Sequence, residues 1–159
     1  MKGDKGVIKR LNDLLAGELT AADQYFVQAR MFHDWGLHRL YERIDHERTD
    51  ELGHASDLVN RILFLEGVPD VAAREPLSIG ADVVEMLKND LEMERTVAGN
   101  LKMSIAYCEE ARDYESRSML EKLLKDTEED HIFWLETQLD LIDRMGLENY
   151  VQLQAKPAD

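Results

Sequence analysis

Cysteine, proline and long apolar runs are scarce in this chain of 159 residues, and each scarcity excludes a class of protein. The one cysteine, Cys108, rules out an intrachain disulfide and a cysteine-based zinc or iron–sulfur site. The three prolines are few and suit a mostly helical chain. No run approaches the roughly 18 apolar residues of a membrane span, and the opening MKGDKGVIKR lacks the apolar region of a signal peptide. We therefore expect a cytoplasmic protein that does not enter membranes.

Basic residues are also under-represented. The chain has 19 Lys and Arg against 33 Asp and Glu, and a formal net charge of −14. This balance argues against binding to nucleic acid or to anionic membranes, because both carry negative charge. It suits a protein that attracts cations, although a solvated acidic surface would have the same composition. At this length we expect one domain over residues 1–159 with a sizeable core.

Apolar residues recur at helical spacing through most of the chain. We expect long helices over about residues 5–34, from just after Gly36 to about 65, over 82–110 and over 113–145, followed by a short helix over 147–154. Asp113 is a suitable N-cap for the fourth helix, and Gly146 is a suitable stop. Residues 66–80 hold two of the prolines and show no sustained period, so we expect a linker there.

The length of this linker predicts the topology. A helix of about 30 residues is about 45 Å long, and about 16 extended residues reach roughly 50 Å. The linker can therefore return the chain to the opposite end, so that the helices on either side of it run parallel. The other turns are too short for this and make their helices antiparallel. The sequence thus predicts an all-α four-helix bundle with one long crossover and a short fifth helix.

A lone Glu followed one helix later by Glu-x-x-His occurs twice. The members are Glu18, Glu51 and His54 in the first copy, and Glu94, Glu128 and His131 in the second. The two glutamates of a copy are 33 residues apart in the first and 34 in the second. Each member lies three, four or seven residues from apolar positions of its own helix. We therefore expect all six side chains to point into the bundle.

Buried carboxylates need a neutralising partner, because an unpaired charge in a core costs several kcal/mol. Two divalent cations would balance four glutamates, and imidazole with carboxylate suits iron or manganese. Di-iron carboxylate proteins hold their metals in helix bundles with this ligand pattern. The alternative is two buried Glu–His pairs with the lone glutamates solvated. The repetition in register favours a dinuclear metal site.

Several runs of the sequence resemble the bacterioferritins, the ferritins that can bind haem. They include LNDLLAGEL around Glu18, ARMFHDWGL at 29–37, RILFLEGVPD at 61–70, HIFWLE at 131–136 and MGLENYVQLQ at 145–154. The resemblance implies a ferritin-like bundle that assembles into a cytoplasmic shell of 24 subunits and stores ferric mineral. It also implies a ferroxidase centre with two Fe ions per subunit, where Fe(II) is oxidised by dioxygen or hydrogen peroxide.

The resemblance also implies roles for the motif residues. It assigns Glu51 and Glu128 as bridging ligands, and Glu18 with His54 and Glu94 with His131 as terminal ligands. This chain has one residue more than the family pattern, near Thr127, just before the second Glu-x-x-His. The motif itself is intact, so we expect the ligands to survive the shift.

Four further residues match family positions near iron. His46, Glu47 and Asp50 match an inner-surface iron site of some relatives, and spacing of four places His46 and Asp50 on one helix face. A solvated helix face is the alternative for this cluster. Tyr25 matches a position beside the di-iron centre, where an aromatic side chain can donate electrons. We expect Tyr25 to lie next to the ligands.

Leu52 is a departure from the family. Haem-binding members have a methionine directly after the first bridging Glu, and its thioether is an axial ligand of haem iron. An isobutyl group has no lone pair, and none of the seven methionines lies in the second helix. We expect no Met-ligated haem in a homo-oligomer. The chain is then either a haem-free ferritin or one partner in a mixed shell with a haem-binding subunit, and a ferredoxin partner for iron release stays an open prediction.

Two other classes of function compete with iron storage. A rubrerythrin-like di-iron peroxidase on the same bundle would need a Cys-x-x-Cys module, which one cysteine cannot supply. A DNA-shielding shell would have no use for a buried ligand set, and the net charge of −14 opposes contact with DNA. The sequence therefore favours an iron-storing ferroxidase.

Overall fold

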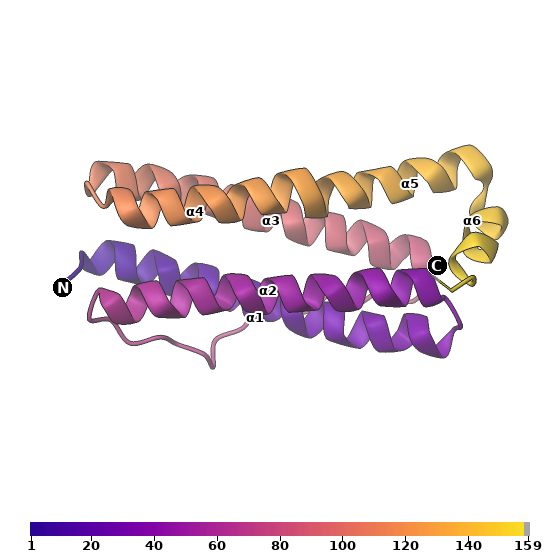
Figure 1. Cartoon of the computed structure of the whole chain (residues 1–159), viewed down its shortest axis with the longest axis horizontal. Coiled ribbons are helices and arrows are strands. Elements are labelled where there is room, and N and C mark those ends of the chain that lie inside the picture. The colour runs from indigo at the N-terminus through magenta and orange to yellow at the C-terminus, as the bar shows by residue number, and fades with distance from the viewer. Residues whose placement is uncertain (158–159) are drawn as a thin grey trace.

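The computed structural model describes residues 1–157 and arranges them as four long helical rods with a short helix across one end (Figure 1). The first three rods are α1 (Lys5–Asp34), α2 (His38–Phe64) and α3 (Val83–Glu110). The fourth rod consists of α4 (Tyr114–Asp126), the π-helical turn η1 (Thr127–Ile132) and α5 (Phe133–Met145). The short helix is α6 (Leu147–Gln154). The predicted all-α bundle with a short fifth helix is confirmed.

Local sequence signals explain where the rods begin and end. The carboxylate of Asp113 accepts a hydrogen bond from the backbone N–H of Ser116, so Asp113 is the N-cap that the sequence predicts. Gly36 and Gly146 follow α1 and α5 with φ of 74° and 80°. This left-handed backbone suits glycine because it has no Cβ.

The crossover between α2 and α3 runs back along the bundle, so these two helices are parallel, as predicted (Figure 1). Side chains of α1 hold it in place. The hydroxyl of Thr20 accepts a hydrogen bond of 2.7 Å from the backbone N–H of Glu75, and the amide oxygen of Gln24 accepts one of 3.1 Å from Ser78. The later part of the crossover is therefore tied to α1.

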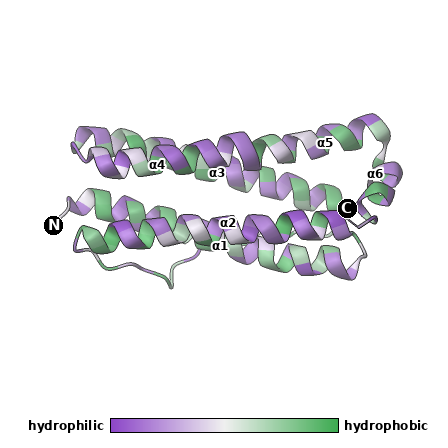
Figure 2. Ribbon diagram, viewed as in Figure 1, coloured by the Kyte–Doolittle hydropathy of each residue, from purple (hydrophilic) through white to green (hydrophobic). Residues whose placement is uncertain are grey.

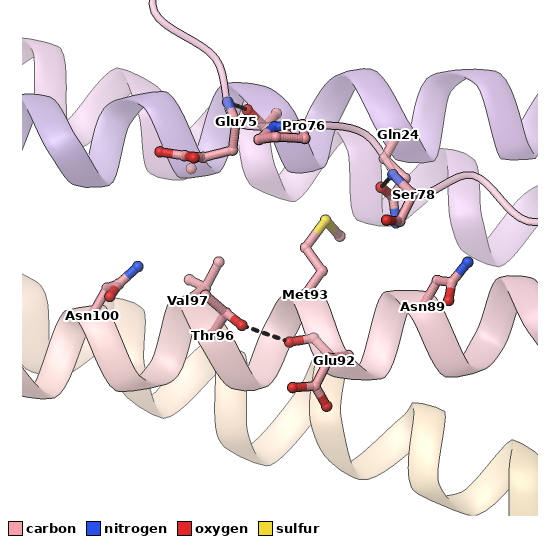
Figure 3. Close-up of a pocket in the computed structure, with 12 residues that line it drawn as sticks. Gln24, Glu75, Pro76, Ser78, Asn89, Glu92, Met93, Thr96, Val97 and Asn100 are labelled. Atoms are coloured by element: carbon pink, nitrogen blue, oxygen red, sulfur yellow. Dashed lines mark hydrogen bonds between the residues drawn. The ribbon is translucent and has the colours of Figure 1, made fainter.

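A hollow of about 410 Å³ lies between the crossover and α3 (Figure 3). Glu75, Pro76 and Ser78 border it on the crossover side, and Met93 on α3 projects into it from the other side. Its lining includes none of the six predicted metal ligands. The crossover thus covers the outside of the bundle and leaves the interior to the four rods.

The apolar core is divided into two clusters, one toward each end of the bundle. Every rod mixes apolar and polar positions along its length (Figure 2). On α1, for example, Leu11 and Leu15 belong to one cluster and Tyr25 and Phe32 to the other. The same division occurs on α2, on α3 and on the fourth rod. Between the two clusters lies a layer of buried polar residues, and that layer contains the predicted site.

Candidate metal centre

Five of the six predicted ligands converge in the layer between the two apolar clusters. They are Glu18 on α1, Glu51 and His54 on α2, Glu94 on α3 and His131 in η1. None is more than 8% exposed. Each lies on the inward stripe of its helix, because it shares a face with core residues three, four or seven positions away. The four rods therefore deliver three carboxylates and two imidazoles to one buried volume.

Glu18, Glu51 and His54 form the first group that could hold a cation. Nδ1 of His54 lies 3.3 Å from Oε2 of Glu51 and 3.6 Å from Oε2 of Glu18. Within the described residues, both oxygens of Glu18 are buried without a hydrogen-bond partner. Such orphaned oxygens are costly unless a cation satisfies them. The donor set, with oxygen and nitrogen ligands within 4.8 Å of one another, fits a divalent transition metal.

Glu51, Glu94 and His131 form the second group. Nδ1 of His131 lies 3.0 Å from Oε1 of Glu51 and 3.2 Å from Oε1 of Glu94. Glu51 therefore presents one oxygen to each histidine. The rings of His54 and His131 lie nearly parallel, with centroids 5.8 Å apart. The two groups are thus adjacent and share one carboxylate, which is the arrangement of a dinuclear centre.

The carboxylates and imidazoles of this layer shift one another's pKa. Burial raises the pKa of the Glu18 carboxyl well above its usual range, and the neighbouring Glu51 raises it further. Burial disfavours the charged form of His54, but the carboxylates of Glu18 and Glu51 beside its Nδ1 outweigh this and raise its pKa to about 11. The pKa of His131 is raised for the same reason, by Glu47, Glu51 and Glu94. Protonated imidazoles therefore stand where cations would bind, and a metal must displace their Nδ1 protons.

The expectation that Glu128 points into the bundle is wrong. Its side chain is 42% exposed and forms an ion pair of 2.5 Å with Lys102. Thr127 takes the inward position instead, where it is 1% exposed and its hydroxyl donates a hydrogen bond to the carbonyl of Leu123. The assignment of Glu128 as a bridging ligand therefore stays a prediction that this geometry does not favour.

The π-helical turn η1 explains the outward position of Glu128. Asp126 and His131 both contact residues of α2, although they are five positions apart. In an α-helix five residues turn the chain by about 500°, which leaves the two side chains about 140° apart. The i→i+5 turn of η1 brings such residues onto one face. The turn keeps His131 in the site and rotates Glu128 out of it.

Tyr25 lies against the second group. Its hydroxyl donates a short hydrogen bond to Oε1 of Glu94, and its ring is buried. Burial and the charge of Glu94 raise the pKa of Tyr25 well above its usual value, so the phenol stays protonated. Tyr25 therefore orients the carboxylate of Glu94 toward His131.

The proposed inner-surface cluster divides between the interior and the surface. His46 and Asp50 are close to each other, with Nε2 of His46 3.2 Å from Oδ2 of Asp50. Glu47 is only 2% exposed; it forms an ion pair with Nε of Arg43 and lies 2.8 Å from Nε2 of His131. Glu47 is thus part of the buried layer, where ligand atoms of Glu47, Asp50, Asp130 and His131 lie within 4.8 Å of one another and could hold a metal ion, whereas His46 is exposed.

Sequence reasoning missed three residues beside the centre. Oδ2 of Asp126 lies 2.7 Å from Nε2 of His54, and Arg43 bridges Glu47 and Asp130. A metal-bound histidine usually donates its second N–H to a carboxylate, so a search for such carboxylates could have drawn attention to Asp126. The partners of Arg43 lie on two different rods, and a motif search along one helix does not reveal them.

Leu52, in the family position of the haem ligand, is 45% exposed on α2. Within residues 1–157, no helix has both the length and the apolar character needed to cross a membrane.

Comparisons with known proteins agree with this architecture. The ferritin-like domain family matches residues 8–145. A bacterial ferritin of Paramagnetospirillum magnetotacticum is 58% identical over 156 residues, which are 98% of this chain and 95% of the relative. A bacterial ferritin of Synechocystis is 54% identical over 97% of this chain and 99% of the relative. A bacterioferritin of Brucella melitensis is 45% identical over 100% of this chain and 98% of the relative. The chain therefore belongs to the ferritin family, as a member of the bacterioferritin type.

Proposed function

We propose that this chain stores iron and oxidises Fe(II) to Fe(III) at the buried centre, as a ferroxidase. The observation that carries this proposal is the shared carboxylate of Glu51, which presents one oxygen to each of two adjacent ligand groups. Two cations held side by side can each give one electron to the same oxidant. The names of the relatives, bacterial ferritin and bacterioferritin, support iron as the metal.

The five inward residues suit two Fe(II) ions as substrates. Glu18 and His54 would bind one ion, Glu94 and His131 the other, and Glu51 both. Three carboxylates carry −3 against the +4 of the two ions, so oxidant or hydroxide can supply the remaining negative charge. Glu128 would have to leave Lys102 and turn inward to become a sixth ligand.

The residues of the chain control protons during this reaction. Binding of the two ions displaces the Nδ1 protons of His54 and His131, so Fe(II) uptake releases protons. Each ion then loses one electron. Dioxygen accepts both electrons with two protons to leave hydrogen peroxide, or hydrogen peroxide accepts them with two protons to leave two waters. Tyr25 keeps its proton and holds Glu94 in place.

Assembly and haem belong to the same proposal. A storage function needs an enclosed volume, and the exposed apolar side chains of Phe26, Leu52, Leu63 and Phe64 are suited to burial between subunits of a 24-subunit cytoplasmic shell. Leu52 does not fit a Met-ligated haem, because it offers no donor atom. A homo-oligomer would therefore lack this haem. In a mixed shell, the other subunit could bind the haem and a ferredoxin for iron release.

An anaerobic Fe(II) titration of the metal-free protein, followed by admission of air, tests the function. We expect a break at two Fe(II) per chain and oxidation much faster than that of free Fe(II), read as absorbance in the near ultraviolet. Glu18→Ala and Glu94→Ala each remove one carboxylate from a ligand group and should abolish the fast phase. Glu110→Ala, which removes an exposed glutamate at the end of α3, should leave it unchanged.

The size of the assembly is measured in parallel, so that loss of the shell is not mistaken for loss of the site. Oxidation as slow as that of free Fe(II) in the parent chain, or fast oxidation in both ligand variants, would overturn the ferroxidase assignment.

A further inference from the structure

Each histidine of the centre has a carboxylate on the nitrogen that faces away from the ligand groups. Nε2 of His54 lies 2.7 Å from Oδ2 of Asp126, and Nε2 of His131 lies 2.8 Å from Oε2 of Glu47. In both cases Nδ1 faces the shared carboxylate of Glu51. The two imidazoles therefore face the same kinds of partner from different rods, although the Asp126 contact is a hydrogen bond and the Glu47 contact is a close ion pair without hydrogen-bond alignment.

The two carboxylates connect the same pair of rods in opposite directions. His54 lies on α2, and Asp126 is the last residue of α4. Glu47 lies on α2, one turn before Glu51, and His131 lies in η1. Each contact thus spans the gap between α2 and the fourth rod. The register between these rods decides whether both histidines are held.

A neutral imidazole has one N–H and one lone pair. An ionised carboxylate accepts hydrogen bonds but cannot donate one. Asp126 and Glu47 therefore favour the tautomer with hydrogen on Nε2, which leaves the lone pair of Nδ1 for a cation. We propose that Asp126 and Glu47 are positioning residues, which fix the tautomer and the ring orientation of His54 and His131 for metal binding. This role presupposes the metal-binding part of the proposed function.

The two carboxylates differ in their surroundings. The side chain of Asp126 is 47% exposed and borders a surface hollow of about 550 Å³ that His54 and Asp57 also line. Glu47 is buried and also paired with Arg43, which in turn binds Asp130. Removal of Asp126 leaves a space that water can fill, whereas removal of the Glu47 charge leaves Arg43 with one buried partner fewer. Asp126 is therefore the cleaner site for a test.

Co(II) is a suitable probe because air does not oxidise it readily and its absorption bands report the ligands around it. Metal-free full-length protein is titrated with Co(II), alone and against a competing chelator. Asp126→Ala should weaken binding at one of the two positions about 10- to 100-fold, the range typical for loss of a carboxylate behind a metal-bound histidine. Asp126→Glu keeps a carboxylate in the same hollow and should restore most of the affinity. Glu47→Gln should weaken the other position.

Asp57→Ala is the matched control. Asp57 lines the same hollow, and its substitution removes the same charge. Asp57 has no hydrogen bond or ion pair with another side chain of residues 1–157. Its Co(II) affinity should equal that of the parent. The thermal unfolding temperature of the metal-free Asp126→Ala protein is measured in parallel, so that a general loss of stability is not mistaken for a loss of metal affinity.

Three outcomes would overturn the inference. Equal Co(II) affinity in Asp126→Ala and the parent would show that the contact does not position His54. Equal weakening in Asp57→Ala and Asp126→Ala would assign the effect to surface charge. Failure of the parent chain to bind two Co(II) would refute the metal-binding part of the proposed function itself, and the role of both carboxylates with it.

Discussion

Deletion of Thr127 should convert the π-helical turn into α-helix and bring a glutamate into the centre. In the deleted chain Glu128 directly follows Asp126, and His131 remains three residues after Glu128. Asp126 and His131 are then four positions apart, which in an α-helix leaves them about 40° apart on one face. Both can keep their contacts with α2 without a π turn. Glu128 takes the buried place of Thr127 and leaves Lys102.

The expected gain is the balance of two effects. A carboxylate and a unit positive charge about 4 Å apart attract by about 4 kcal/mol at an effective dielectric constant of about 20. Burying a side chain that is now 42% exposed removes about 1 to 2.6 kcal/mol of that attraction. We expect a net gain of about 1.4 to 3 kcal/mol when two divalent cations are bound, which is roughly 10- to 100-fold tighter binding.

In the metal-free protein, the deletion of Thr127 should lower stability instead of raising it. A fourth carboxylate beside Glu18, Glu51 and Glu94 then has no cation to neutralise it. A loss of about 2 kcal/mol in a chain of this size lowers the unfolding temperature by about 4 to 8 °C. Differential scanning calorimetry with and without Co(II) measures both signs. The deleted chain should unfold at a lower temperature than the parent without metal and at a higher temperature with it.

Two variants isolate the effect of register. Thr127→Ala keeps the chain length and the π turn, so its metal affinity should equal that of the parent. Glu128→Ala in the parent should also leave metal affinity unchanged, because the side chain lies outside the site. A clear loss of affinity in Glu128→Ala would mean that Glu128 turns inward when metal binds. No gain in affinity for the deleted chain would refute the register argument.

Two other changes have definite expected outcomes. Burial raises the pKa of the Asp90 carboxyl to about 7, although hydrogen bonds from Gln24 and Gln28 oppose the rise; the charges of Glu94 and Glu47 add smaller increases. Ionised Asp90 therefore destabilises the folded state. This loss of folding free energy is absent below about pH 4, grows as the pH rises and is complete above about pH 7, where it is at most about 4 kcal/mol. Asp90→Asn should raise the unfolding temperature of the metal-free protein relative to the parent more at pH 8 than at pH 4, and an equal difference at both pH values would contradict the shift. Leu52→Met should allow added haem to bind in the assembled protein with the spectrum of a bis-methionine complex, and the absence of a Soret band would show that more than the ligand has been lost.

The helices and their order could be predicted from the sequence because they depend on local patterns. Apolar periodicity, the N-cap Asp113, and the glycines at 36 and 146 predict rods whose bounds agree with the structure within a residue or two. The crossover follows from chain length alone, because only the linker after α2 is long enough to span the bundle. These signals act over a few residues and need no knowledge of the neighbouring rods.

The candidate centre could be predicted only in part. Glu18, Glu51, His54 and Glu94 lie in uninterrupted α-helix, so their spacing from core residues correctly predicts that they face inward. The same rule is wrong for Glu128, because it assumes 100° per residue through a segment that forms a π-helical turn. The resemblance predicts an extra residue near Thr127, but it does not predict whether a helix would absorb it at Thr127 or in the turn before α4.

Contacts between rods were settled by tertiary structure. That Asp126 meets His54, that Glu47 meets His131 rather than His46, and that Glu51 offers one oxygen to each group depend on how far each rod is shifted along its neighbour. Helical spacing determines the face on which a side chain lies, but it carries no information on this axial shift. The axial shift comes from the packing of the two apolar clusters on either side of the centre. This packing therefore gives the set of inward-facing residues the defined geometry of a site.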